Sequence, residues 1–213
     1  MAQEMQWGKV QRHLATLVPE RDAEMRAMEA YAEKTSFPII GPVAGHFCYQ
    51  TARMVGARRV FELGSGFGYS TAWFAHAVRD NGGGEVHHVV WDKNLSDRAR
   101  KHLGRLGFDG IVRFHVSEAV EALTGAEGTF DLIFNDIEKQ DYPSALPVIE
   151  AKLRPGGVLI VDNALWHGRV FDRADRSAPT HGVRELTRRL TSDPGWITSL
   201  VPVRDGLLVA LRR

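Results

Sequence analysis

The residues best suited to chemistry in this sequence are three polar residues that follow two short apolar segments. Asp136 follows the segment 130–135, and Asp162 and Asn163 follow the segment 158–161. Two carboxylates and an amide oxygen form a set of hard oxygen ligands suited to Mg²⁺, with coordination positions left for water or a substrate. Each residue taken singly is more commonly a turn cap, so the prediction of a metal site depends on all three lying together.

The surrounding elements predict a sheet edge at which these residues would meet. Apolar segments typical of strands alternate with segments of helical periodicity. Strands are expected at residues 58–63, 86–91, 111–116, 130–135, 158–161, 196–203 and 207–211. Helices are expected at residues 43–55, 70–78, 95–106, 118–123, 143–153 and 179–190. The alternation predicts an α/β fold with a doubly wound, mostly parallel seven-stranded sheet that ends in an antiparallel hairpin. The carboxyl ends of its parallel strands would share one edge.

A glycine-rich turn follows the expected strand at 58–63. Gly64, Gly66 and Gly68 have no Cβ, so the backbone there can approach a ligand closely. The helix that follows would present its free N–H groups at the same edge of the sheet. The dinucleotide-binding pattern needs a glycine where the chain has Tyr69, which disfavours a nicotinamide-dependent oxidoreductase.

Composition is that of an ordinary globular protein. The chain has 213 residues, of which 44% are hydrophobic and 25% charged, so we expect one domain over 1–213, with 1–35 as a helical extension broken near Pro19. A net charge of +1 provides no field for holding a polyanion. Cys48 is the only cysteine, which excludes an intrachain disulfide and favours a reducing compartment. The sequence has neither a signal peptide pattern nor a membrane-spanning run, so a cytoplasmic protein without a membrane partner is expected.

Two motifs carry a resemblance to a known family. The stretch Glu62-Leu-Gly-Ser-Gly-Phe-Gly-Tyr-Ser70 resembles the first motif of class I S-adenosylmethionine (SAM) methyltransferases. The stretch Asp162-Asn-Ala-Leu-Trp-His-Gly168 resembles the most distinctive motif of the cation-dependent O-methyltransferases, which include catechol and caffeoyl-CoA O-methyltransferases. The similarity covers nearly the whole chain. It implies a Rossmann-like methyltransferase that uses SAM together with Mg²⁺, Mn²⁺ or Ca²⁺.

The resemblance also implies roles for individual residues by matching position. Asp136, Asp162 and Asn163 would hold the metal, and Lys139 would be the catalytic base beside the reacting hydroxyl. Trp91 would lie against the adenine of SAM. The residues implied at the SAM site are Glu62, Gly64, Ser65, Gly66, Ser70, Trp91, Asp92, Ser117, Glu118 and Asp136.

One position departs from the family pattern. Relatives carry an acid for the ribose of SAM two residues before the position of Asp92, and this chain has Val90 there. We expect Asp92 to take over the role, because alternate residues of a strand share a face. If it does not, SAM binding is weakened or the chain binds SAM without catalysis.

Three functions therefore stay open. The favoured one is metal-dependent transfer of a methyl group from SAM to a hydroxyl of a small aromatic vicinal diol, by an enzyme that we expect to be a homodimer. The second is methylation of a hydroxyuridine in tRNA, and the third is SAM binding with little turnover. Binding to tRNA requires basic residues near the site, because phosphate contacts dominate nucleic-acid affinity. The candidates are Arg184, Arg188, Arg189, Arg204, Arg212 and Arg213, which a solvated helix face and a charged tail explain equally well.

Overall fold

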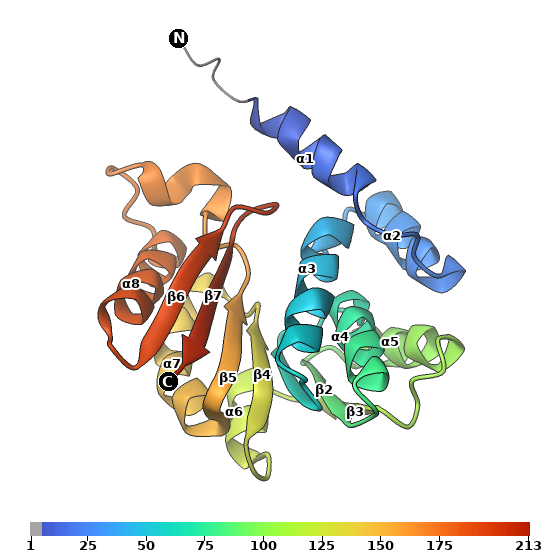
Figure 1. Cartoon of the computed structure of the whole chain (residues 1–213). Coiled ribbons are helices and arrows are strands. Elements are labelled where there is room, and N and C mark those ends of the chain that lie inside the picture. Colours follow the sequence, from blue (N-terminus) through green and yellow to red (C-terminus); the bar gives the residue numbers. More distant parts are fainter. Residues whose placement is uncertain (1–5) are drawn as a thin grey trace.

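The computed structural model describes residues 6–213, which form a seven-stranded sheet with helices on both faces (Figure 1). The strands are β1 (Arg59–Leu63), β2 (Glu85–Val90), β3 (Val112–Val116), β4 (Phe130–Asn135), β5 (Leu153–Val161), β6 (Trp196–Val201) and β7 (Leu207–Arg212). The α-helices are α1 (Trp7–Thr16), α2 (Ala23–Thr35), α3 (Gly41–Met54), α4 (Tyr69–Asp80), α5 (Lys93–Arg105), α6 (Ala119–Gly125), α7 (Tyr142–Lys152) and α8 (Ala178–Ser192). Two short 3₁₀ helices are η1 (Lys139–Asp141) and η2 (Trp166–Phe171).

The strand order β3-β2-β1-β4-β5-β7-β6 confirms the predicted mostly parallel, doubly wound sheet. β1 pairs in parallel with both β2 and β4, so the winding direction reverses between β1 and β4. Open α/β sheets bind ligands at such a switch point, outside the carboxyl ends of the strands. β7 is antiparallel to β5, with Leu208 opposite Val161, so β7 begins where β5 ends.

The two faces of the sheet each bury their own apolar core. Val60 and Leu132 belong to the core beneath α2 to α5, whereas Phe61 and Ile133 belong to the core beneath α6, α7 and α8. Neighbouring residues of one strand point to opposite faces, which accounts for the apolar residues at successive positions in β1 (Val60 and Phe61) and β4 (132–134).

The N-terminal region forms the two predicted helices, and the first five residues of the predicted extension lie outside the described part. Met25 and Met28 bury α2 against the core, whereas α1 projects away from the body (Figure 1). The helix predicted at 43–55 begins earlier in the structure, because α3 already starts at Gly41. Pro42 fits there, since the first turn of a helix makes no use of the missing N–H.

Two predicted strands have different ends in the structure. β5 begins at Leu153 instead of residue 158, and its pairing register with β4 shifts in this added part. β6 ends at Val201 instead of residue 203, because Pro202 has no N–H for the ladder. Among residues 6–213, no helix is long and apolar enough to cross a membrane.

Candidate active site

A cavity of about 710 Å³, called the main cavity here, lies at the carboxyl edge of the parallel strands. Its walls come from the ends of β1, β2, β4 and β5, from the start of α6 and from the turn before β7. Polar and aromatic residues from these segments face it: Gly64, Trp91, Ser117, Glu118, Asp136, Lys139, Asp162, Asn163, Trp166 and Arg204. Most residues implied by the resemblance therefore share one site.

A second cavity of about 180 Å³, the glycine-turn cavity, adjoins the main cavity and shares Gly64 and Asp136 with it. Ser65, Gly66 and Ser70 also line it. Gly64 has a φ of +85°, and a Cβ at this position would lie 2.7 Å from the backbone oxygen of Asp136. Glycine is thus required for the ends of β1 and β4 to approach each other.

Glu62 does not line either cavity in the described part of the chain. Its side chain is completely buried behind the glycine turn and accepts a hydrogen bond of 2.5 Å from the Thr71 hydroxyl. Burial raises the pKa of Glu62 to about 8. Glu62 is therefore placed to hold the first turn of α4 rather than to contact a ligand.

The end of β2 differs from what the sequence analysis expected. Val90 lines the main cavity, and Trp91 lies at its wall with 74% of its surface exposed, free to cover a planar ligand. Asp92 is exposed and caps α5, with Oδ1 accepting a hydrogen bond of 2.6 Å from the Asn94 N–H. The structure thus does not bring Asp92 into the cavity, because its carboxylate satisfies a free donor of the first helical turn instead.

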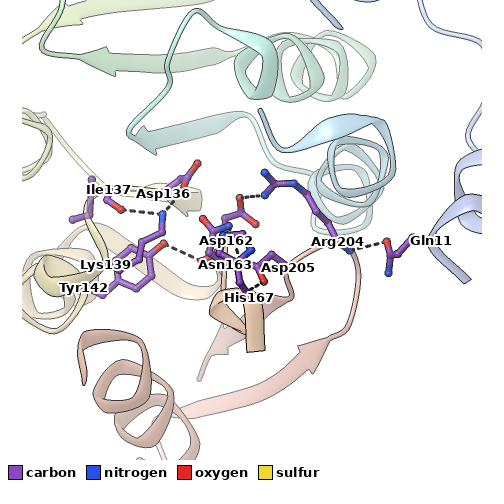
Figure 2. Close-up of polar contacts among 10 residues, drawn as sticks. All are labelled: Gln11, Asp136, Ile137, Lys139, Tyr142, Asp162, Asn163, His167, Arg204 and Asp205. Carbon is purple, nitrogen blue, oxygen red and sulfur yellow. Dashed lines mark hydrogen bonds and ion pairs between the residues drawn. The ribbon is translucent and has the colours of Figure 1, made fainter. Parts of the chain in front are cut away.

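Lys139 lies inside the main cavity and is only 8% exposed (Figure 2). Its Nζ donates to Asp136 Oδ1 at 2.6 Å and to the Ile137 carbonyl at 3.1 Å. The ammonium also lies 5.3 Å from the centre of the Tyr142 ring. These contacts exclude a solvated surface lysine and aim the amine at the space between the strand ends.

Asp162 is the most deeply buried of the three predicted metal ligands, with 1% of its surface exposed. Its Oδ2 accepts a hydrogen bond of 3.0 Å from Arg204, whereas its buried Oδ1 has no partner among residues 6–213. Burial and the nearby charge of Asp136 raise the pKa of Asp162 to about 7. Burial likewise raises the pKa of Asp136, which Lys139 opposes.

Asn163 is held by the turn that precedes β7. Its φ of +56° lies in the left-handed region that asparagine tolerates. Its Nδ2 donates to Asp205 Oδ2 at 3.1 Å, and Asp205 Oδ1 accepts the His167 N–H at 2.7 Å (Figure 2). Because a carboxylate only accepts hydrogen bonds, Asp205 fixes the amide nitrogen and leaves the amide oxygen available to the cavity.

The donor set fits a divalent cation. Asp136, Asp162 and Asn163 supply hard oxygen atoms, and the unpartnered Oδ1 of Asp162 is a buried acceptor that lacks a donor. No group of three or more His, Cys, Asp or Glu side chains within 6–213 has metal-binding geometry, so any site here depends on the amide of Asn163 as its third ligand. The acidic residues that line the cavity outnumber the basic ones, five to two: Glu118, Asp136, Glu138, Asp141 and Asp162 against Lys139 and Arg204.

Four residues that shape the site had no predicted role beside the metal ligands or the base. Tyr142 donates to the Asp162 carbonyl at 2.9 Å, Trp166 flanks Lys139, and Arg204 and Asp205 contact the predicted metal ligands. The turn Arg204-Asp205-Gly206 was the available signal for these last two residues. It joins the two strands of the predicted antiparallel hairpin, and β7, which follows it, starts beside the end of β5.

Comparisons with known proteins agree with this geometry. The profile of the family described as O-methyltransferase matches residues 19–213. A catechol O-methyltransferase from Niastella koreensis is 30% identical over 203 residues, which cover 90% of each chain. The O-methyltransferase TomG from Streptomyces achromogenes, solved in complex with SAM, superimposes with a TM-score of 0.86 at 26% identity and covers 100% of this chain and 99% of its own. The cofactor-bound protein Rv0187 from MTB gives the same TM-score of 0.86 at 26% identity, with 99% of both chains covered.

The fold and the glycine turn at its switch point define the class of SAM-dependent methyltransferases. Within that class, the profile match over almost the whole length decides the assignment. The chain belongs to the O-methyltransferase family and is a SAM-dependent O-methyltransferase.

Proposed function

We propose that the enzyme transfers a methyl group from SAM to one hydroxyl of a small aromatic vicinal diol, with a divalent cation held by Asp136, Asp162 and Asn163. The single observation that carries the proposal is the meeting of this oxygen set with Lys139 in one cavity beside the glycine turn. The similarity to a catechol O-methyltransferase supports the same acceptor class.

The two adjoining cavities supply a place for SAM. The glycine-turn cavity would take the amino-acid end, next to Ser65 and Ser70, and the main cavity would take the adenosine between Trp91 and Ser117. Val90 offers the ribose no charged partner, so the affinity would depend on the glycine turn and on contact with the Trp91 ring.

The reaction is an in-line displacement at the methyl group, so the protein chiefly has to aim an oxygen and remove its proton. A cation held by Asp136, Asp162 and Asn163 would supply Lewis-acid chemistry that lowers the pKa of the reacting hydroxyl. The neutral amine of Lys139 would accept the hydroxyl proton at Nζ, and Asp136 would hold the resulting ammonium by the 2.6 Å hydrogen bond that the structure shows. Trp166 closes the cavity beside Lys139 and would limit the entry of water.

The contacts of the arginines favour a small acceptor over tRNA. Arg184 donates to four backbone carbonyls in residues 169–175, and Arg212 donates to the carbonyls of Glu150 and Leu153. Arg188 and Arg189 bind Glu185, and Arg204 binds Asp162. Five of the six arginines considered for RNA binding are thus engaged within the protein.

Product analysis by mass spectrometry tests the proposal directly. With SAM and Mg²⁺, a catechol should gain one methyl group and a phenol with a single hydroxyl should not, and EDTA should abolish turnover. Full activity in EDTA would exclude the metal, and inactivity on every catechol together with methylation of a hydroxyuridine-containing tRNA would move the acceptor to RNA. Tight binding of S-adenosylhomocysteine without any turnover would support a SAM-binding protein.

Lys139→Ala tests the assignment of the base. The variant should lose about two to four orders of magnitude in kcat, because a general base contributes about that much. Lys101→Ala, the same change at an exposed position of α5, is the matched control and should keep full activity. A loss in Lys139→Ala of less than about threefold would place the lysine outside the chemistry.

We also propose that the enzyme is a homodimer, in which a second copy covers the projecting α1. None of the residues of α1 is buried in the single chain, and Trp7 at its start is 44% exposed. Light scattering on the purified chain should give the mass of two copies, and Trp7→Asp should shift it to one. A monomeric wild-type protein would contradict the proposal.

A further inference from the structure

Arg204 brings a positive charge to the carboxylate that would hold the metal. Its guanidinium lies 3.0 Å from Asp162 Oδ2, and only 32% of the Arg204 side chain is exposed. Asp136, the other carboxylate of the set, is bound by Lys139 at 2.6 Å. Each of the two carboxylates therefore has a cation of the protein itself as a partner.

The turn holds Arg204 in an unusual backbone conformation. Its φ is +52°, in the left-handed region that favours glycine, although the residue is an arginine. Its backbone N–H donates to Gln11 Oε1 of α1 at 3.0 Å, which ties the turn to the N-terminal helix (Figure 2). An arginine costs backbone strain at such a position, so a role of its side chain would explain its presence.

Arg204 also separates two cavities. It lines the main cavity and, on its other side, an outer cavity of about 840 Å³ to which Trp7, Gln11 and Phe171 contribute. The Arg204 side chain thus forms part of the wall of the main cavity, beside the predicted metal ligand Asp162.

We propose that Arg204 is a built-in competitor of the metal: its guanidinium neutralises Asp162 when the site is empty and sets a weak affinity for divalent cations. The inference rests on the proposed metal site. Asp162 Oδ1 stays open to a metal ion while Oδ2 holds Arg204, so the ion would bind within a few ångströms of a positive charge. Like charges at that distance repel, and the repulsion lowers the affinity for the ion.

Arg204→Gly removes the competing charge and suits the left-handed backbone of the turn. We expect Mn²⁺ alone to bind this variant about tenfold tighter than the wild type, a change of the size that one nearby charge produces in a partly screened site. Arg204→Lys keeps the charge and should bind Mn²⁺ with nearly wild-type affinity. Titration calorimetry and the electron paramagnetic resonance signal of free Mn²⁺ both measure this affinity without any turnover.

Arg213→Gly is the matched control, because it removes the same charge at the opposite end of β7. It should leave the Mn²⁺ affinity unchanged. Equal affinities of wild type and Arg204→Gly would overturn the competition, and weaker binding by Arg204→Gly would show that Arg204 positions Asp162 for the metal. If neither wild type nor Arg204→Gly binds Mn²⁺, the proposed metal site itself is wrong. A thermal denaturation midpoint for each variant checks that the fold is retained.

Discussion

Gly182 of α8 controls the position of the proposed base, although it lies outside the cavity. α8 packs on η1, and a Cβ on Gly182 would lie 2.1 Å from the backbone oxygen of Lys139. Ordinary contacts of this kind begin at about 3.5 Å, so Gly182→Ala must push the Lys139 backbone away by more than about 1 Å. A misplacement of about 1 Å can cost about a hundredfold in rate. We therefore expect kcat to fall by about that factor.

The same change should leave SAM binding nearly intact. The glycine turn lies at the end of β1, whereas Gly182 packs against η1 after β4. Calorimetry with S-adenosylhomocysteine should therefore give an affinity close to that of the wild type. Overpacking costs about 1–3 kcal/mol of stability, which in a protein of this size lowers the midpoint of thermal denaturation by several degrees. Assays should thus be made well below that midpoint.

Two comparisons make the Gly182 prediction decisive. Gly125→Ala adds the same methyl group at the end of α6, where no atom lies within 4 Å, and should keep full activity. The double variant of Gly182→Ala with Lys139→Ala should be no slower than Lys139→Ala alone, because both changes remove the same group from the reaction. Full kcat in Gly182→Ala, or independent losses in the double variant, would refute the reasoning.

Three further predictions concern residues around the site that line neither of its cavities. The pKa of Glu62 is raised from 4.5 to about 8, so the folded protein should lose stability as the pH rises between these values. Glu62→Gln carries no titrating group, so its gain in melting temperature over the wild type should grow over this range. A gain that stays constant with pH would contradict the pKa shift. Asp92→Ala should cost about 1 kcal/mol as a lost helix cap and leave the affinity for S-adenosylhomocysteine unchanged; a tenfold weaker affinity in calorimetry would show that Asp92 does contact the ribose. Arg184→Ala should speed hydrogen exchange in 169–175, because it removes the donor to four carbonyls of this loop, whereas unchanged exchange would mean that other contacts hold the loop.

The periodicity of apolar residues was sufficient to predict the alternation of strands and helices, because each strand is buried on one or both of its faces. The same order of elements placed Asp136, Asp162 and Lys139 at one edge, where the structure brings them into one cavity. Asp136 and Asp162 could be found because each follows directly on a buried strand. Lys139 lies in the short helix η1 after β4, and its role was implied by the resemblance.

Two residues expected at the SAM site, Glu62 and Asp92, line neither cavity, because each side chain is held by the helix that follows it. Glu62 looked like a ligand contact, but Thr71 of α4 and complete burial turn it inward. Asp92 looked like a substitute for the missing acid at the position of Val90, but a free N–H of α5 holds its carboxylate. The cap on α5 was missed because this helix was predicted to begin at residue 95, whereas it begins at Lys93, next to Asp92.

The antiparallel position of β7 explains why an active site built on parallel strands also receives side chains from the turn before a strand. In a wholly parallel sheet, the turns that precede strands lie at the opposite edge from the ligand. β7 runs against β5, with Leu208 opposite Val161, so the turn before β7 reaches the carboxyl edge. Arg204 and Asp205 thereby contact Asp162 and Asn163. In the sequence, α8 and β6 lie between this turn and the other residues of the site. Substitutions in the turn can therefore change the charge at the metal ligands without altering the parallel strands that carry those ligands.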